Sequence, residues 1–164
     1  MKLCAACWNK VLIFNLGFDA KGPDGDHWLY VPDPAVCFYR VGFYDVIFGA
    51  DRMSLYVEIG LDRHAVPIDE SAWLERVLAD LEHVGITTGQ HLVAWHSAVL
   101  DPAYVHVTRH GKADFAERSA WLAERGVHSI GRYGGWTYCS IEDNIVEARS
   151  LAERLGGAIE REDA

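Results

Sequence analysis

The stretch VLIFNLGF, residues 11–18, is the first of four segments whose composition decides the fold. It is rich in branched and aromatic residues, which favour a pleated and half-buried strand. Three similar stretches follow it, separated by Gly, Pro or Asp: HWLYVP at 27–32, FYRVGFYD at 38–45 and MSLYVEIG at 53–60. Strand-forming segments at this close spacing predict an antiparallel meander.

The segment after these strands has the periodicity of a helix. Apolar residues recur at intervals of three and four between Trp73 and Val84, and Gly85 follows as a stop. Asp69 or Ser71 can accept hydrogen bonds from the first free amides of such a helix. We therefore expect an amphipathic helix that lies on the sheet.

A further apolar stretch, residues 91–100, predicts another strand. Asp101-Pro102 should end it, because proline has no N–H to give to a sheet ladder. Ala103 and Tyr104 are then expected to lie in a turn.

Two elements are expected in the following region. Residues 112–125 carry apolar side chains at helical spacing and are closed by Gly126. Residues 127–130 are expected to form a short buried strand. Together with the earlier segments, this order predicts an α+β fold with a mostly antiparallel sheet flanked by helices.

The last helix has the clearest start signal in the chain. Ser140 and Asp143 form a capping-box-like pair, and an apolar stripe runs from Ile141 to Leu155 before two glycines at 156–157. We expect a single domain over residues 1–164, with a substrate-type region at 1–126 and a returning strand and helix at 127–164.

Composition and charge exclude several classes of function. The 164 residues are 50% hydrophobic, and 24 acidic against 15 basic residues give a net charge of −9. This charge repels nucleic acid, and no apolar run reaches the roughly 20 residues that span a bilayer. We expect a cytoplasmic protein with four reduced cysteines and with neither nucleic acid nor membrane as a partner.

The segment GRYGGWTY, residues 131–138, is the strongest candidate for a binding site. Its three glycines would let the backbone approach a flat ligand closely. The predicted helix N-terminus that follows, together with the cation of Arg132, suits an anion or the pyrimidine edge of a reduced flavin. The alternative is an ordinary glycine-containing connection with an arginine at the surface.

This segment resembles the C-terminal part of the FAD-dependent amine-oxidase-like flavoproteins, in particular their UDP-galactopyranose mutase branch. Two earlier segments, WLYVPD at 28–33 and FYRV at 38–41, are similar to paired strand motifs of that family. Ala103-Tyr104 lies where the family has an alanine-tyrosine-proline turn, although Val105 replaces the proline here. In order and approximate spacing, the likeness covers residues 10–157.

The resemblance implies a role for each matching residue. The residues that would border a flavin are Gly131, Arg132, Tyr133, Gly134, Trp136 and Tyr138. The residues that would hold an anionic substrate are Tyr30, Arg40, Tyr104 and Tyr138. These side chains suit the implied roles, because arginine binds phosphate or carboxylate in a bidentate manner and tyrosine donates hydrogen bonds from a rigid ring. Alternatively, Tyr30 is a strand aromatic and Arg40 pairs with Asp45.

The family's G-x-G-x-x-G turn, which binds the dinucleotide, has no counterpart in this sequence. We therefore expect a truncated or split subunit of an FAD-dependent oxidoreductase-like or mutase-like protein, which binds an anionic small molecule and binds FAD only when a partner chain supplies the dinucleotide site. A homodimer is also possible in this interpretation, since a missing domain would leave apolar surface to cover.

Two alternatives remain. One is a flavin-free binding protein or isomerase/cyclase, in which His106 or His128 would transfer protons. The other is a fragment of a longer protein. Catalytic residues and substrate stay open.

Other cysteines and histidines do not predict a metal site. Cys4–Cys7 has a metal-like spacing but lacks a second pair of ligands. His106 and His110 have helical spacing in a segment rich in β-formers, and His91 and His96 would face opposite sides of a strand.

Overall fold

The computed structural model describes residues 7–162, with the backbone alone for residues 157–162. The chain divides into two compact units, one of Cys7–Val105 and one that contains residues 106–162. We call them the sheet unit and the helical unit and describe each by itself. The division falls after Val105, earlier than the boundary at residue 126 expected from sequence, and the single-domain organisation stays a prediction.

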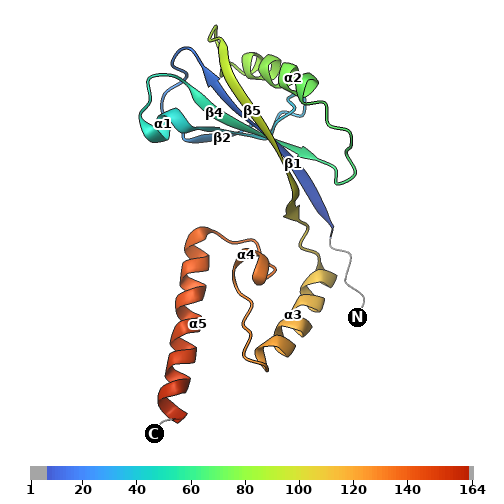
Figure 1. Cartoon of the computed structure of the whole chain (residues 1–164), viewed down its shortest axis with the longest axis vertical. Coiled ribbons are helices and arrows are strands. Elements are labelled where there is room, and N and C mark those ends of the chain that lie inside the picture. Colours follow the sequence, from blue (N-terminus) through green and yellow to red (C-terminus); the bar gives the residue numbers. More distant parts are fainter. Residues whose placement is uncertain (1–6, 163–164) are drawn as a thin grey trace. The chain divides into compact units, whose positions relative to one another are not determined.

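The sheet unit is a five-stranded sheet with one long helix on it (Figure 1). All neighbouring strands are antiparallel and follow the order β2-β3-β4-β1-β5. This confirms the predicted α+β class. The elements are β1 Trp8–Phe18, β2 Trp28–Tyr30, β3 Arg40–Phe43, α1 Tyr44–Phe48, β4 Ser54–Leu61, α2 Glu70–His83 and β5 Leu92–Val105.

The predicted meander holds for β2, β3 and β4 but is wrong for β1. Instead of pairing with β2, β1 lies between β4 and β5 and is hydrogen-bonded on both sides. Its apolar run explains this position, because Val11, Leu12, Phe14 and Leu16 are each 2% exposed or less. A strand buried this fully needs a neighbour at each edge to pair its backbone.

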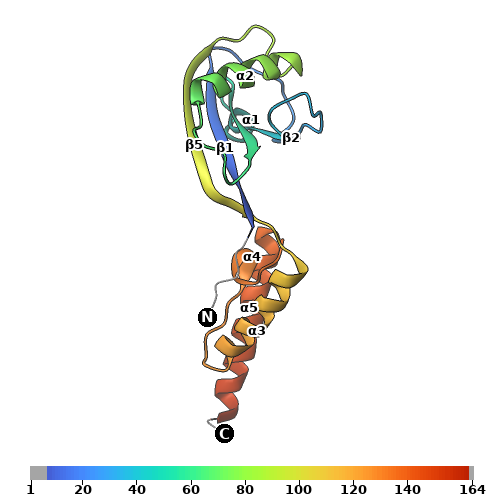
Figure 2. The same ribbon diagram turned by 90° about the vertical axis from the view of Figure 1, so that its right-hand side faces the viewer.

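The helix α2 covers one face of the sheet and forms the core with it (Figure 2). Asp69 caps the helix as predicted, since its carboxylate accepts a hydrogen bond of 3.1 Å from the amide of Ala72. Val77 and Leu81 of α2 are fully buried against strand residues such as Phe14. The predicted amphipathic helix on the sheet is therefore confirmed.

The strand β5 runs past Asp101-Pro102, so the predicted turn at Ala103 and Tyr104 is wrong. The β1–β5 register shifts there, because Asn9 pairs with Tyr104 while Val11 pairs with Leu100. Residues 101–103 thus bulge opposite Lys10 alone, and a bulge tolerates a proline that has no N–H. Lys10 Nζ forms an ion pair of 3.1 Å with Asp101, which holds this bulge to β1.

The helical unit contains α3 Arg109–Ala123, α4 Gly131–Gly134 and α5 Ile141–Glu162. The helix α3 begins earlier than the predicted start at residue 112, because the Thr108 hydroxyl caps it by accepting from the amide of Gly111 at 3.0 Å. The buried strand predicted at 127–130 is wrong: the segment is irregular and Val127 is 52% exposed. A short apolar run without a neighbouring strand has no ladder to join.

The helix α5 continues past the glycines at 156–157 to Glu162. Gly156 lacks the left-handed backbone conformation of a helix-terminating glycine, so it only weakens the helix by about 1 kcal/mol. The capping box at the start is confirmed, since Ser140 Oγ accepts from the amide of Asp143 at 3.1 Å while the Asp143 carboxylate accepts from the amide of Ser140 at 2.8 Å.

The helical unit lacks a core of its own among its described residues. Every buried apolar residue of the described chain lies between Val11 and Ile86, in the sheet unit. On α5, by contrast, Ile141 is 79% and Ile145 64% exposed. The apolar stripe predicted from sequence is thus present but uncovered. No helix among residues 7–162 has the length and apolar character needed to cross a membrane.

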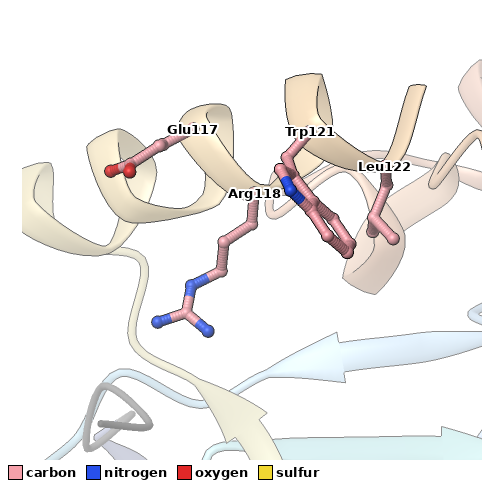
Figure 3. Close-up of a pocket in the computed structure, with 4 residues that line it drawn as sticks. All are labelled: Glu117, Arg118, Trp121 and Leu122. Atoms are coloured by element: carbon pink, nitrogen blue, oxygen red, sulfur yellow. The ribbon is translucent and has the colours of Figure 1, made fainter. Parts of the chain in front are cut away.

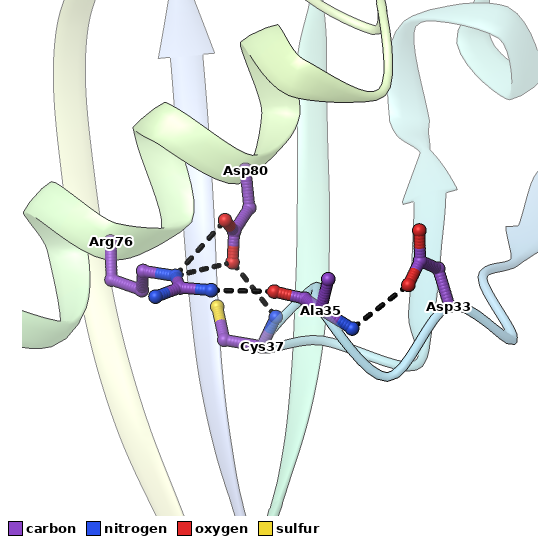
Figure 4. A network of polar contacts seen from close by, with 5 residues as sticks. All are labelled: Asp33, Ala35, Cys37, Arg76 and Asp80. Carbon is purple, nitrogen blue, oxygen red and sulfur yellow. Dashed lines mark hydrogen bonds and ion pairs between the residues drawn. The ribbon is translucent and has the colours of Figure 1, made fainter.

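A polar network fastens α2 to the loop between β2 and β3 (Figure 4). The Asp80 carboxylate accepts hydrogen bonds from the backbone amide of Cys37 at 2.8 Å and from Arg76 Nε at 2.9 Å. Burial works to raise the pKa of Asp80, but these hydrogen bonds outweigh it and hold the pKa below its ordinary value. Burial, with the neighbouring Asp80, raises the pKa of Cys37 to about 12, so this thiol is unreactive near neutral pH.

Replacing Asp80→Ala should lower the free energy of unfolding by about 2 kcal/mol, because it leaves the half-buried Cys37 amide without a partner. Urea denaturation at neutral pH measures this loss, and Glu82→Ala on the exposed side of α2 is the matched control. Because the folded-state pKa of Asp80 is depressed, its contribution is present above about pH 4 and is lost as pH falls through the folded-state pKa. Equal effects of both variants would contradict the prediction.

Candidate functional site

The sheet face opposite α2 carries a row of polar and aromatic side chains. Cross-strand pairing aligns Tyr30 of β2 with Arg40 of β3, and Arg40 with Glu58 of β4. The neighbouring row, which includes Val41 and Val57, points the other way into the core. Since side chains alternate along a strand, Tyr30, Arg40 and Glu58 share the face that α2 leaves open.

Glu58 is the centre of this row. Its carboxylate accepts a hydrogen bond from Arg40 Nη2 through one oxygen and from the Tyr39 hydroxyl through the other. The guanidinium carbon of Arg40 lies 6.0 Å from the centre of the Tyr30 ring. Glu58 is only 6% exposed, so these contacts neutralise a carboxylate that water barely reaches. We call Tyr30, Tyr39, Arg40, Glu58 and Tyr104 the Glu58 cluster.

The proton affinities within the cluster reflect this arrangement. Burial, the hydrogen bond to Glu58 and the negative charge of Glu58 raise the pKa of Tyr39, and Tyr104 raises it further. Burial works to lower the pKa of Arg40, but its hydrogen bonds to Glu58 and Tyr30 outweigh burial and raise the pKa. At neutral pH Arg40 is therefore charged and Tyr39 is neutral.

A second row of aromatic rings lies beside the cluster. Gly42 follows Arg40 by two residues on the same face, and a Cβ there would lie 2.1 Å from the Tyr56 ring. Glycine thus leaves room for Tyr56, whose ring is 5.3 Å from that of Tyr44. Trp28, which pairs with Gly42, is 59% exposed. These aromatic surfaces suit a flat or sugar-like ligand next to the charged pair.

The structure thus brings three of the sequence-predicted substrate residues into one cluster. Arg40 and Tyr30 touch, and Tyr104 lies close enough to influence Tyr39. Sequence analysis missed Glu58 as the partner of Arg40, although its place among apolar residues of a strand was a signal, since a buried carboxylate needs a cation. The alternative pairing of Arg40 with Asp45 is wrong. Asp45 is 1% exposed and accepts a hydrogen bond of 3.2 Å from the amide of Ser54.

The predicted flavin-side residues lie in the helical unit and form the turn of α4. Gly131 has a φ of 83°, and a Cβ there would lie 2.9 Å from Asn144 Oδ1. Its amide donates to Glu147 at 2.8 Å, and the next amide, of Arg132, donates to Asn144 at 2.9 Å. The glycine is thus required by the packing of α4 on α5. Gly134 likewise lies close to Ser129, because a Cβ there would be 3.1 Å from the Ser129 hydroxyl.

The side chains of this turn point in two directions. The guanidinium carbon of Arg132 lies 4.1 Å from the centre of the Tyr138 ring, which is 79% exposed. Tyr133 is 55% exposed. Trp136 instead lies against the start of α3, where a Cβ on Gly111 would be 2.9 Å from the indole nitrogen. Tyr133 and Tyr138 are accordingly the exposed aromatic members of the motif, and Arg132 lies beside Tyr138.

The N-terminus of α5 offers less to an anion than sequence implies. The capping box already occupies the amides of Ser140 and Asp143. Two acids, Glu142 and Asp143, stand in the first turn and would repel an anion there. The positive charge of this segment therefore comes from Arg132 and not from the helix end.

A cavity of about 430 Å³ lies along α3, and none of the predicted flavin or substrate residues is among its described lining residues (Figure 3). Glu117, Arg118, Trp121 and Leu122 line it, and Arg118 forms an ion pair of 3.0 Å with Asp114. Its described lining residues all belong to α3.

The histidines and cysteines gather into no metal-binding cluster within residues 7–162. Cys4 lies outside the described residues, so the Cys4–Cys7 spacing stays untested. His106 follows the end of β5 at Val105, and His110 lies in α3. Both are exposed, as is His128.

The sheet with its long helix defines an α+β class of protein, and comparison with solved structures identifies a specific likeness. The crystal structure of reduced UDP-galactopyranose mutase matches with a TM-score of 0.66 and 20% sequence identity. The match covers 82% of this chain but 30% of that protein. The fold is thus similar to part of UDP-galactopyranose mutase, as the sequence motifs implied. No family model and no curated protein matches the sequence.

Replacing Glu58→Gln should lower the free energy of unfolding by about 2–3 kcal/mol, because the half-buried Arg40 loses its counter-ion. Thermal unfolding at neutral pH, monitored by circular dichroism, measures the change. Glu75→Gln, on the exposed side of α2, is the control and should have almost no effect. If the two variants were equally stable, Glu58 would not stabilise the cluster as proposed.

Tyr39 should also make the protein sensitive to alkali. Its folded-state pKa is raised, so its contribution to stability is present below about pH 10 and is lost as pH rises through the folded-state pKa. Ultraviolet absorption of tyrosinate should show late ionisation of Tyr39 and of Tyr56, whose pKa burial also raises, and Glu58→Gln should bring the ionisation of Tyr39 to lower pH. A titration with no such late group would contradict the burial of Tyr39.

Proposed function

We propose that the chain is the substrate-binding part of a split flavoprotein-like system, in which another chain supplies the FAD site. In this proposal an anionic small molecule binds at the open sheet face through Tyr30, Arg40 and Tyr104. The observation that carries it is the gathering of these three residues around Glu58, in a fold similar to part of UDP-galactopyranose mutase.

The chemistry of the Glu58 cluster supports binding of an anion without proton transfer by the cluster itself. Arg40 is held by Glu58, so it has a fixed direction and loses little side-chain entropy when it meets a ligand. Tyr30 is 64% exposed next to it and can donate a hydrogen bond. Because Glu58 already neutralises Arg40, we expect weak binding in which hydrogen bonds and aromatic contact matter as much as charge.

The helical unit supports the second half of the proposal. Arg132, Tyr133 and Tyr138 would border a flavin that is held by the partner chain, together with Gly131, Gly134 and the Trp136 backbone. FAD would supply electron transfer when bound, and these residues would orient its ring edge. The uncovered apolar residues of α5 give the partner chain a surface on which to dock.

A flavin-free binding protein or isomerase/cyclase is the alternative function. It is favoured by the same cluster, because its pocket would use Tyr30, Arg40 and Tyr104 together with Tyr138 and would need no flavin. An isomerase would need a proton-transferring group, for which the exposed His106 and His128 are the candidates.

Anion binding is tested by titrating the protein with inorganic pyrophosphate and following backbone amides by NMR. Shifts should concentrate at Tyr30, Arg40 and Tyr104, and Tyr30→Phe should weaken binding about fivefold through loss of one hydrogen bond. Tyr44→Phe, on the same face but outside the cluster, is the control and should bind as the wild type does. Shifts confined to other regions would contradict the site.

Contact with flavin is tested separately by titrating FAD against the protein and following flavin fluorescence. Because the partner chain would hold the dinucleotide, the chain alone should quench FAD fluorescence only weakly and at high protein concentration. This weak quenching should be lost in Arg132→Ala, whereas Arg149→Ala on the exposed side of α5 should leave it unchanged. Pyrophosphate binding without any flavin quenching would favour the flavin-free alternative.

A further inference from the structure

Among residues 7–162, the strand β5 is a sheet edge of unusual length and composition. It spans Leu92–Val105, whereas the opposite edge, β2, has three residues. From Leu92 to Leu100 the sequence LVAWHSAVL has no proline, and His96 is its only ionisable side chain. Native edge strands usually carry lysine or proline or are kept short, which prevents pairing with another chain.

The side chains of this edge are also open to solvent within the sheet unit. Val93 is 59%, Trp95 43%, Val99 38% and Leu100 47% exposed. The register with β1 is regular from Ala94 to Leu100, so no bulge interrupts the backbone groups that a further strand would pair with. The irregular positions lie at the two ends of this stretch, beside Phe18 and at residues 101–103.

The order of residues along the edge is nearly the same in both directions. With His96 as the centre, Ala94 matches Ala98, Val93 matches Val99 and Leu92 matches Leu100, and the exception is the pair Trp95 and Ser97. When two identical strands pair antiparallel about His96, a residue that precedes His96 in one copy faces the residue at the same separation after His96 in the other copy. At the matching positions each residue therefore faces a residue of its own type. This self-complementarity selects a second copy of the chain over an unrelated strand.

We propose that two copies of this chain pair antiparallel through β5, with His96 facing its own copy across a two-fold axis. The two sheets then form one continuous sheet. Trp95 of each copy lies opposite Ser97 of the other, and both α2 helices lie on the same side. The pairing satisfies the outer backbone groups of the edge and covers Trp95, Val99 and their copies. It leaves the Glu58 cluster on the open face accessible, so it is independent of the proposed function.

The oligomeric state is tested by sedimentation of the full chain at concentrations up to about 100 µM, where a stable pair should be present. His96→Lys places two ammonium groups opposite each other and should shift the protein to monomer, by at least about tenfold in dissociation constant. His83→Lys, at the exposed end of α2, is the matched control and should leave the pair intact. His96→Thr should also retain it. A monomeric wild type, or a dimeric His96→Lys variant, would overturn the proposal.

The register is tested by cysteine crosslinking in a background with Cys4, Cys7 and Cys139 replaced by Ser. Residues 96 of the two copies would have Cα atoms about 5 Å apart, within disulfide range, so His96→Cys should crosslink efficiently. Ala94→Cys should not, because the two copies of residue 94 would be about 13 Å apart along the strands. Equal crosslinking of both variants would overturn the assigned register.

Discussion

The sheet unit depends on the burial of β1 between β4 and β5. Its apolar residues supply one side of the core, and its two edges fix the positions of the strands that carry the Glu58 cluster and the long outer edge. At about 25 cal/mol per Å² of apolar surface removed from water, this strand contributes more to folding than any single polar contact described above. Burial of the apolar face thus fixes the positions of the polar side chains on the opposite face of the sheet.

The Glu58–Arg40 pair illustrates how a polar site is maintained on such a sheet. A carboxylate that is 6% exposed would be costly alone, and Arg40 with Tyr39 compensates for its burial. The consequence is a guanidinium with a fixed orientation but little net charge to offer. A ligand that prefers this face must therefore use the surrounding rings, which Gly42 makes possible by leaving space for Tyr56.

Sequence analysis predicted most elements of the fold and part of the cluster, and the physical reasons differ between elements. Local signals were sufficient for α2 and for the start of α5, because a cap and a periodic face act within one helix. The neighbours of β1 and the passage of β5 through Pro102 depend on pairing between distant segments, which local composition does not encode. Glu58 was missed for the same reason, since its partner Arg40 lies on another strand. The strand expected at 127–130 failed because the described part of its unit contains no strand with which it could pair.

Two uncovered surfaces make different demands on a partner. The edge of β5 presents backbone donors and acceptors in a self-matching order, which an identical strand satisfies. The helical unit presents exposed side chains such as Ile141 and Ile145 without a regular backbone edge, so it requires a complementary apolar surface. A single contact cannot satisfy both, because strand pairing is directional and side-chain burial is not. Pairing through β5 therefore leaves Ile141 and Ile145 of the helical unit exposed, where the partner chain proposed above would have to bind.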